Sequence, residues 1–329
     1  MRRGLRSTPQ GQHRPVLLDE VLAVLNPSPG KVMVDCTAGW AGHSREILQR
    51  LGATGRLIAC DLDSDNLPQV RQRLEEVAHP FCVHHTNFAG LPQILGSEGL
   101  DGVDGILADL GMSSMQVDDP GRGFSYAREG PLDMRMDRTR GRTAAQLLAD
   151  MEPEAVAEAL WEFGDEPAAR TLAPALVQAA RAGQLTTTTD LSRLIQETLG
   201  GNRPWKLHPR KGKWNLHPAA RTFQALRILV NRELANLQHL LRVLPNLLRP
   251  GGTAAIISFH SGEDRLVKTS FRDGFRLGMY SEISDEAIRA SSNERFVNPR
   301  SRSAKLRWAR RADVEIADSS QSIDSSPGN

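Results

Sequence analysis

Short apolar runs alternate with amphipathic stretches in the first third of the chain. The apolar runs predict strands at residues 32–35, 56–60, 81–84 and 103–109. Between them, apolar residues recur at steps of three and four, which predicts helices at residues 44–51, 64–78 and 88–95. Strands that alternate with helices are typical of a parallel sheet covered by helices on both faces. A fifth apolar run, residues 253–259, is expected to join this sheet.

The middle of the chain has a different pattern. A loop rich in Gly, Pro and charged residues is followed by helical patterns, without any strand-like run, at residues 144–151, 153–163, 166–182 and 190–199. We interpret this region as an all-helical subdomain inserted between the fourth and fifth strands. An apolar stripe from Phe223 to Leu244 then predicts one long helix that packs against the sheet.

These patterns divide the chain into a sheet domain and an inserted unit. The sheet domain is expected in two parts, residues 1–120 and 216–312. The helical subdomain, with a basic loop at its end, is expected at residues 121–215. The tail, residues 313–329, is rich in Ser and Asp and is predicted to be disordered.

The turn after the first strand carries the strongest chemical signal. Residues 35–44 contain Gly39 and Gly42 and lead directly into a helix. Glycine allows close approach of the backbone, and free N–H groups at a helix N-terminus point toward a ligand. Asp61 ends the second strand about 20 residues after the turn, where a carboxylate can accept hydrogen bonds from ribose hydroxyls. This pattern predicts a site for an adenosine-containing cofactor.

The spacing of the turn favours S-adenosylmethionine over a dinucleotide. A dinucleotide fingerprint has glycines in the spacing G-x-G-x-x-G. Here bulky Trp40 follows Gly39, and no glycine completes the pattern. S-adenosylmethionine has no pyrophosphate and tolerates a looser turn. Phe88, after the third strand, is a candidate apolar shelf for the adenine, although a single Phe is more often part of a core.

Polar residues also follow the fourth and fifth strands. Because the carboxyl ends of parallel strands meet at one edge, Gly39, Asp61 and Asp109 should converge on one crevice. Asp109 can hold the amino group of methionine or accept a hydrogen bond from a substrate amine, or it can simply cap a turn. His260 can be a general base, a substrate contact or a structural hydrogen-bonding group, and the sequence leaves these alternatives open.

The net charge of +2 conceals two clusters of basic residues. Residues 198–232 contain no Asp or Glu, and their basic and aromatic side chains include Arg203, Trp205, Lys206, Arg210, Lys211, Lys213 and Arg221. A second acid-free run, residues 295–311, includes Arg300 and Arg302. Positive charge interleaved with tryptophan suits a polyanion that also presents bases for stacking. The plainer alternative is a solvated surface or loop.

Composition narrows the class further. No apolar run approaches the length of about 20 residues that spans a bilayer, and the basic N-terminus has no apolar segment typical of a secretory signal. The three cysteines have no paired spacing, which argues against disulfides and against a zinc site. We therefore expect a cytoplasmic protein without a structural metal or a membrane partner.

Eight blocks of the sequence resemble the RsmH (MraW) family, in the same order and over residues 13–310. The blocks are residues 13–20, 35–44, 109–114, 122–125, 130–137, 217–227, 257–261 and 298–307. The resemblance implies a Rossmann-like class I methyltransferase sheet with an inserted helical domain for RNA. It also implies S-adenosylmethionine-dependent methylation of N4 of a cytidine in 16S ribosomal RNA of the small subunit.

The resemblance further implies which residues contact the cofactor: Ala41, Gly42, His43, Asp61, Phe88, Asp109 and Gln116. Ala41 stands where the family usually has glycine, and its methyl group is expected to be tolerated with a negative φ. Asp109, with backbone carbonyls of residues 110–113, is our candidate for accepting hydrogen bonds from the target amine. The basic clusters and His260 are the candidate RNA contacts.

Two other function classes stay open at this point. A nicotinamide-dependent oxidoreductase has a similar sheet, but the third glycine is missing. A non-catalytic RNA-binding assembly factor could keep the fold, but Asp61 and Asp109 argue against it. A DNA amino-methyltransferase is weaker still, because the fourth strand is not followed by an Asp/Asn/Ser-Pro-Pro-aromatic motif. DNA is therefore not expected as a partner, and the oligomeric state, possible homodimer included, is left undetermined.

Overall fold

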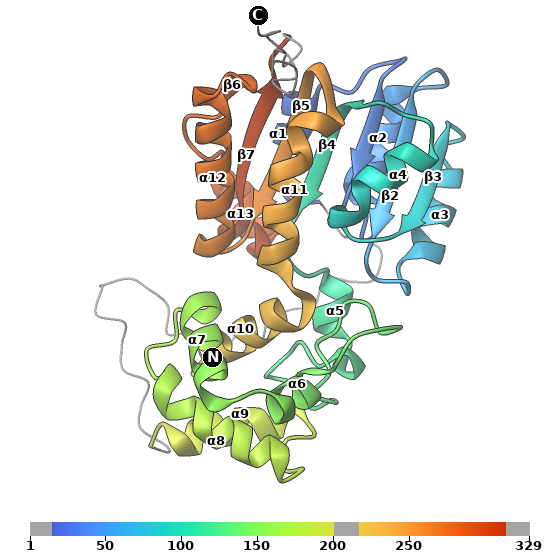
Figure 1. The fold of residues 1–329 in the computed structure, drawn as a ribbon. Helices are drawn as coiled ribbons and strands as arrows, with labels where there is room; N and C mark the ends of the chain where they lie inside the picture. The colour runs from blue at the N-terminus through green and yellow to red at the C-terminus, as the bar shows by residue number, and fades with distance from the viewer. Residues whose placement is uncertain (1–14, 201–216, 314–329) are drawn as a thin grey trace, which may run out of the picture.

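A seven-stranded sheet forms the centre of the larger part of the molecule. The computed structural model describes residues 15–200 and 217–313 (Figure 1). The strand order is β3-β2-β1-β4-β5-β7-β6, in which only β7 runs antiparallel to its neighbours β5 and β6. The strands are β1 Val32–Asp35, β2 Arg56–Asp61, β3 Phe81–His85, β4 Val103–Asp109, β5 Leu248–Ser258, β6 Tyr280–Ile283 and β7 Lys305–Arg311. The expected α/β fold is confirmed.

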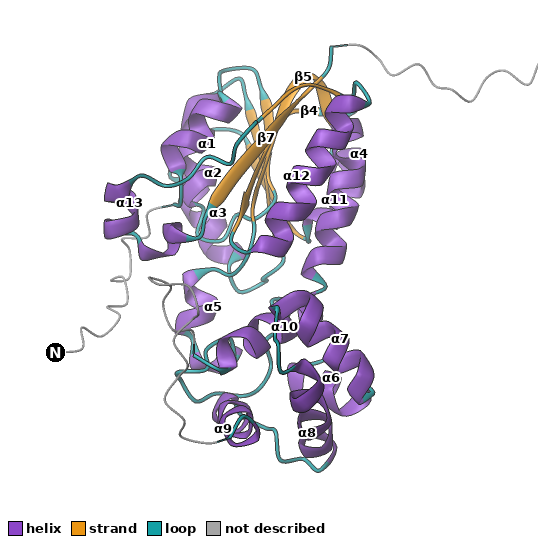
Figure 2. Ribbon diagram, turned by 90° about the vertical axis from the view of Figure 1, so that its left-hand side faces the viewer, coloured by secondary structure: helices purple, strands orange, loops and turns teal. Residues whose placement is uncertain are grey.

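Helices cover both faces of the sheet, because successive strand residues point to opposite sides. In β4, Leu107 packs with one hydrophobic cluster, whereas Ile106 and Ala108 pack with the other. The first face is covered by α1 Leu18–Leu25, α2 Gly42–Leu51 and α3 Leu67–Glu75. The second face is covered by α4 Leu91–Ser97, α11 Glu233–Leu247 and α12 Ser261–Arg276 (Figure 2). The short helix α13 Ser292–Val297 lies on the side of the first face.

The inserted helices form a second unit below the sheet in Figure 1, with a core of their own. Its helices are α6 Ala144–Asp150, α7 Pro153–Gly164, α8 Ala169–Arg181, α9 Thr188–Thr198 and α10 Ala219–Asn231. The short helix α5 Ser114–Asp118 leads from the sheet into this unit. None of the helices in the described residues is long and apolar enough to cross a membrane.

The expectation of a single long helix over residues 223–244 is wrong. The chain forms two helices, α10 and α11, separated by Arg232 in the left-handed conformation with φ 52°. The reason lies in the two cores: Phe223 and Leu226 pack into the helical unit, whereas Leu237 and Leu240 pack against the sheet. One straight helix cannot bury both sets. Thus α10 shares the core of the inserted unit.

The two C-terminal strands, β6 and β7, were not predicted from the sequence. In β7 the reason is that most of its positions are charged. Lys305 and Arg307 are satisfied by Asp264 of α12, with N–O distances of 2.5 and 2.7 Å. Arg310 pairs with Glu282 of β6 at 2.7 Å. Much of the second basic run is therefore neutralised within the sheet domain.

Candidate active site

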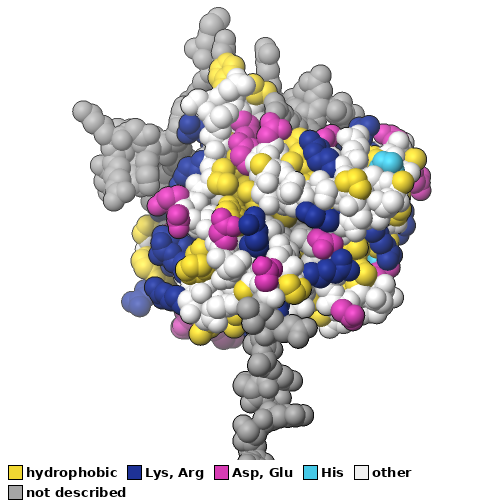
Figure 3. All heavy atoms as spheres, turned by 90° about the horizontal axis from the view of Figure 1, so that it is seen from above, with side chains coloured by type: hydrophobic (Ala, Val, Ile, Leu, Met, Phe, Trp, Pro, Cys, Tyr) yellow, Lys and Arg dark blue, Asp and Glu magenta, His cyan; other side chains and the backbone are white. Residues whose placement is uncertain are grey.

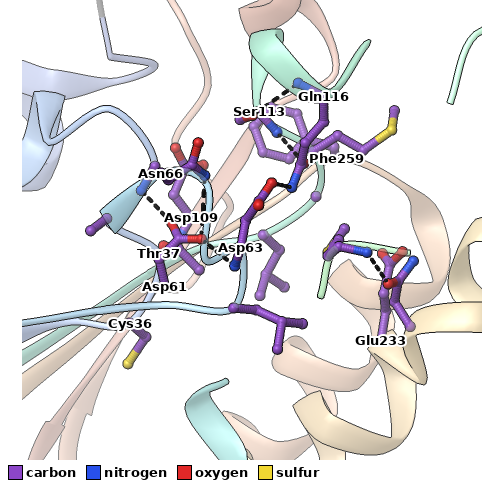
Figure 4. A pocket seen from close by; sticks show the side chains of 18 of the residues that line it. Cys36, Thr37, Asp61, Asp63, Asn66, Asp109, Ser113, Gln116, Glu233 and Phe259 are labelled. Carbon is purple, nitrogen blue, oxygen red and sulfur yellow. Dashed lines mark hydrogen bonds between the residues drawn. The ribbon is translucent and has the colours of Figure 1, made fainter. Parts of the chain in front are cut away.

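A cavity of about 420 Å³ lies where the carboxyl ends of β1, β2, β4 and β5 face the helical unit. Seven of the eight residues predicted to contact the cofactor line it: Gly39, Gly42, His43, Asp61, Phe88, Asp109 and Gln116. The eighth, Ala41, is buried at the start of α2 and is not part of the cavity wall. The predicted convergence of the strand ends is thus present in the structure (Figure 4).

Two of three consecutive residues in the glycine turn have a left-handed backbone conformation. Gly39 has φ 52° and Ala41 has φ 57°. The expectation that Ala41 keeps a negative φ is therefore wrong. An alanine in this conformation costs about 1 kcal/mol, which the surrounding contacts of the turn offset. Gly42 is required for a different reason: a Cβ there would lie 2.6 Å from Cγ of Pro15, a residue of the cavity wall.

Asp35, for which the sequence predicts no role, anchors this turn. Its buried carboxylate accepts hydrogen bonds from Ser44 Oγ at 2.6 Å and from the Thr37 backbone N–H at 3.0 Å. Thr37 Oγ1 in turn accepts the backbone N–H of Asp109 at 2.7 Å. The tips of β1 and β4 are tied together in this way, which fixes the backbone of Asp109.

Asp61 holds the other side of the turn. Its Oδ2 accepts the Gly39 N–H at 2.6 Å, and its Oδ1 accepts the Asp63 N–H at 2.8 Å and Asn66 Nδ2 at 3.3 Å. Burial raises the pKa of this carboxyl to about 6, against the lowering effect of these hydrogen bonds. A carboxylate has about four lone-pair sites, so Asp61 keeps capacity for donors that enter the cavity.

A buried ion pair behind the cavity was not predicted from the sequence. Arg122 Nη1 lies 2.6 Å from Asp63 Oδ2, and Gln116 Nε2 donates to the same oxygen at 2.9 Å. Arg122 also donates to the carbonyls of Arg135 and Met136. Arg122 belongs to one of the matching sequence blocks, but its partners lie far away along the chain. The pair connects the end of β2 to the segment that enters the helical unit.

The side chain of Asp109 has few hydrogen-bonding partners among the described residues. Its Oδ1 is enclosed and accepts no hydrogen bond from the described residues, and its Oδ2 lies 3.7 Å from His43 Nδ1. Burial, and then the charges of Asp35 and Glu263, raise its pKa well above the usual range. Burial also lowers the pKa of His43, whose Nε2 lies 2.9 Å from the carbonyl of Val16.

The cavity therefore fits a ligand that carries a positive charge. A buried carboxyl oxygen without a donor is stabilised by a cation or an N–H group placed beside it. A sulfonium and an ammonium group are both present in S-adenosylmethionine. Asp61 at the end of β2 and Phe88 line the same cavity.

The candidate RNA contacts lie in several places. Arg300 lines the cavity, Arg302 is exposed nearby, and Arg221 is half-buried on α10. His260 is the N-terminal cap of α12, where its Nδ1 accepts the Glu263 N–H at 3.4 Å, and it does not line the cavity. The remaining candidates lie outside the described residues: Arg203, Trp205, Lys206, Arg210, Lys211 and Lys213.

The fold and the cavity define a class I methyltransferase, the class of enzymes that uses S-adenosylmethionine. A dinucleotide-binding sheet has its sixth strand beside the fifth. Here the antiparallel strand β7 lies between β5 and β6. The chain belongs to the MraW methylase family, whose model matches residues 10–312. The oxidoreductase and the non-catalytic alternatives find no support.

Similar proteins from other organisms match nearly the whole chain. "Ribosomal RNA small subunit methyltransferase H" of Sorangium cellulosum is 43% identical over 92% of this chain and 92% of its own length. The protein of the same name from Koribacter versatilis is 43% identical over 94% of this chain and 97% of its own length. Among solved structures, NSun6 from Pyrococcus horikoshii has a TM-score of 0.43 and 15% identity, covering 94% of this chain and 57% of that chain.

Proposed function

We propose that this protein transfers a methyl group from S-adenosylmethionine to N4 of a cytidine in 16S RNA of the small ribosomal subunit. The observation that carries the proposal is Asp109, which lines the same cavity as the cofactor residues and as residues of α10 and α11, and whose enclosed Oδ1 accepts no hydrogen bond from the described residues. The names of the relatives support the choice of small-subunit ribosomal RNA as the substrate.

The residues of the glycine turn and of the neighbouring strand ends would hold the cofactor. Asp61 would accept hydrogen bonds from the ribose hydroxyls, and Phe88 would pack against the adenine. Gln116 also lines the cavity, and its hydrogen bond to Asp63 orients it. Asp109 would lie beside the positively charged end. The bound cofactor supplies a methyl group activated by its sulfonium.

The target amine needs help because its lone pair is delocalised into the cytosine ring. Hydrogen-bond acceptors that bind the N–H groups localise the lone pair on nitrogen and orient it toward the methyl group. Asp109 and residues 110–113 line the cavity, and their acceptors would take this role. Gly111 has φ 97°, which lets this turn bend at the end of β4. Once ionised, a carboxylate with a raised pKa is also a better proton acceptor.

Methyl transfer onto small ribosomal subunits from a strain that lacks this protein tests the proposal. Tritiated S-adenosylmethionine should label the RNA, and nucleoside analysis should place the label in N4-methylcytidine. Label in another nucleoside, or no label above the level without enzyme, would reject the proposed reaction. Subunits from a strain that contains the protein are the control, because their site is already methylated.

We predict that Asp61→Asn weakens cofactor binding by about 10- to 100-fold, as expected for the loss of charged hydrogen bonds. Ribose donors favour the ionised form of Asp61, whose pKa in the free protein is about 6. The affinity of the wild type should therefore decrease as the pH falls through about 6, and this dependence should be absent in Asp61→Asn. Calorimetry of cofactor binding measures both effects. Glu75→Gln, an exposed acid at the end of α3, is the control; equal losses in both variants would contradict the assignment.

RNA binding is expected to depend on the basic loop. The face of the sheet domain opposite the cavity carries Lys and Arg interspersed with Asp and Glu, which does not suit a polyanion (Figure 3). Neutralising Lys206, Arg210 and Lys211 together should reduce the slope of log affinity against log salt by about 2–3, because each phosphate contact contributes about 0.7–0.9.

Filter binding of the RNA at several salt concentrations measures this slope. The matched control neutralises three exposed arginines that already have acidic partners: Arg142, Arg181 and Arg193. An unchanged slope in the loop variant would place the RNA surface elsewhere.

A further inference from the structure

The cavity has a second half, beyond the residues expected to hold the cofactor. This second half is formed by the junction of α10 with α11 and by the start of α12, next to the ends of β4 and β5. Its polar side chains are those of Arg227, Asn231, Glu233, Asn236 and Glu263. In Figure 4, Glu233 lies on the opposite side of the drawn cavity from Asp61. None of these side chains has a role in the proposed binding of the cofactor.

Arg227 and Glu233 form a bidentate ion pair in this half. Arg227 Nε and Nη2 donate to the two oxygens of Glu233, each at 2.8 Å, and only about 11% of each side chain is exposed. Burial opposes the charged form of Arg227, but Glu233 and Glu263 outweigh it and raise its pKa. Nη1 makes no hydrogen bond with the described residues. A guanidinium N–H group is thus left over on a residue of the cavity wall.

The backbone around the pair is fixed from both sides. Asn231 accepts the Met136 N–H at 2.7 Å and donates to the Met134 carbonyl at 2.8 Å. The left-handed Arg232 then places Glu233 at the first position of α11, within reach of Arg227. Buried ion pairs contribute little to stability compared with apolar residues, so such an oriented pair in a cavity suggests a role in recognition.

The two halves of the cavity offer complementary hydrogen-bonding groups. Asp109 provides acceptors, and its pKa responds to Glu263, so the two acids lie within electrostatic range of each other. Arg227 provides a donor, and Glu263 also acts on its pKa. Cytosine presents an N4 amine next to two acceptors, N3 and O2, whereas uracil presents a carbonyl at position 4 and an N–H at N3. A donor opposite N3 therefore accepts cytosine and repels uracil.

We propose that Arg227, oriented by Glu233, donates to the acceptor edge of the target base and selects cytosine over uracil. This inference rests on the proposed function, because it requires a cytosine whose amine faces Asp109. Arg227 is a specificity-determining residue that contacts the base, and Glu233 is a positioning residue that acts through Arg227.

The test measures base preference separately from methyl transfer. The full chain, saturated with S-adenosylhomocysteine, is titrated with cytidine, uridine and 3-deazacytidine, which lacks N3, and binding is followed by ligand NMR. The wild type should prefer cytidine over both other nucleosides by about tenfold or more, the discrimination typical of a buried hydrogen-bonding group. In Arg227→Gln the preference should fall below about twofold, and Arg227→Lys should restore part of it. Glu233→Gln should reduce the preference while S-adenosylhomocysteine affinity stays unchanged.

The control is Arg242→Gln, an exposed arginine on α11 that should retain the full preference. The inference is overturned if Arg227→Gln keeps the wild-type preference, if the wild type shows none, or if Arg227→Gln loses S-adenosylhomocysteine binding to the same extent as cytidine binding. Failure of the proposed function is seen separately, as wild-type enzyme that leaves small subunits without N4-methylcytidine.

Discussion

Replacing Asp109 with Asn is expected to reduce methyl transfer by about 10²–10³-fold, the usual effect of removing one group aimed at the reacting atoms. The same variant should be more stable than the wild type. In the folded protein the pKa of Asp109 is raised by burial and by neighbouring acids. The folded state therefore holds this proton more tightly than the unfolded state, so Asp109 makes stability decrease as the pH rises through its raised pKa.

Thermal unfolding of the cofactor-free protein at pH 5.5 and at pH 8 measures the stability effect. Asp109→Asn should raise Tm by about 2 °C or more at pH 8, because 1 kcal/mol corresponds to about 2–4 °C for domains of this size range. The gain should be smaller at pH 5.5. Asp101→Asn, in the exposed loop before β4, should change neither activity nor Tm. An active Asp109→Asn enzyme, or one that is less stable at both pH values, would contradict the role given to this acid.

Replacing Arg122 with Met is expected to destabilise the protein by about 3 kcal/mol or more, because it leaves the buried Asp63 charge without its partner. Tm should fall by about 5 °C or more. Cofactor affinity should fall as well, since Gln116 of the cavity wall shares Asp63 Oδ2 with Arg122. Chemical denaturation and calorimetry measure the two effects.

A second substitution separates the charge from the packing of Arg122. Asp63→Asn added to Arg122→Met removes the uncompensated charge, so the double variant should regain part of the lost stability. The exposed pair of Arg142 with Asp150 is the comparison, and Arg142→Met should have little effect. If Arg142→Met and Arg122→Met cost the same, burial of the Asp63 pair does not have the importance we give it.

The sequence was sufficient for the parts of the fold with a local hydrophobic pattern. The predicted strand at residues 103–109 matches β4, and the other parallel strands begin or end within a few residues of their predicted limits. β7 was missed because its buried arginine is compensated by Asp264, a partner more than 40 residues away in the chain. The break at Arg232 was missed because the apolar spacing continues through it, and only the existence of two separate cores requires the turn.

The same distinction explains the candidate site. Gly39, Asp61 and Asp109 follow strands directly, so the general rule for parallel sheets was enough to bring them together. Arg122 with Asp63 is a pair that forms across 59 residues of sequence, and no local pattern indicates it. The Arg227 and Glu233 pair is close in sequence, but only the left-handed residue between the helices makes it possible. Ala41 shows the opposite error, because residue type alone suggested the wrong φ.

The chain passes between the sheet and the helical unit at two places, the segment after β4 and the junction at Arg232. Residues at both crossings, Leu110 and Glu233 among them, belong to the wall of the same cavity. Any tilting of the helical unit must therefore bend the chain along this wall and change the shape of the space within it. A small molecule bound in this cavity would contact both the sheet domain and the helical unit and would fix the angle between them. It would thereby set the angle at which the helices meet a large substrate.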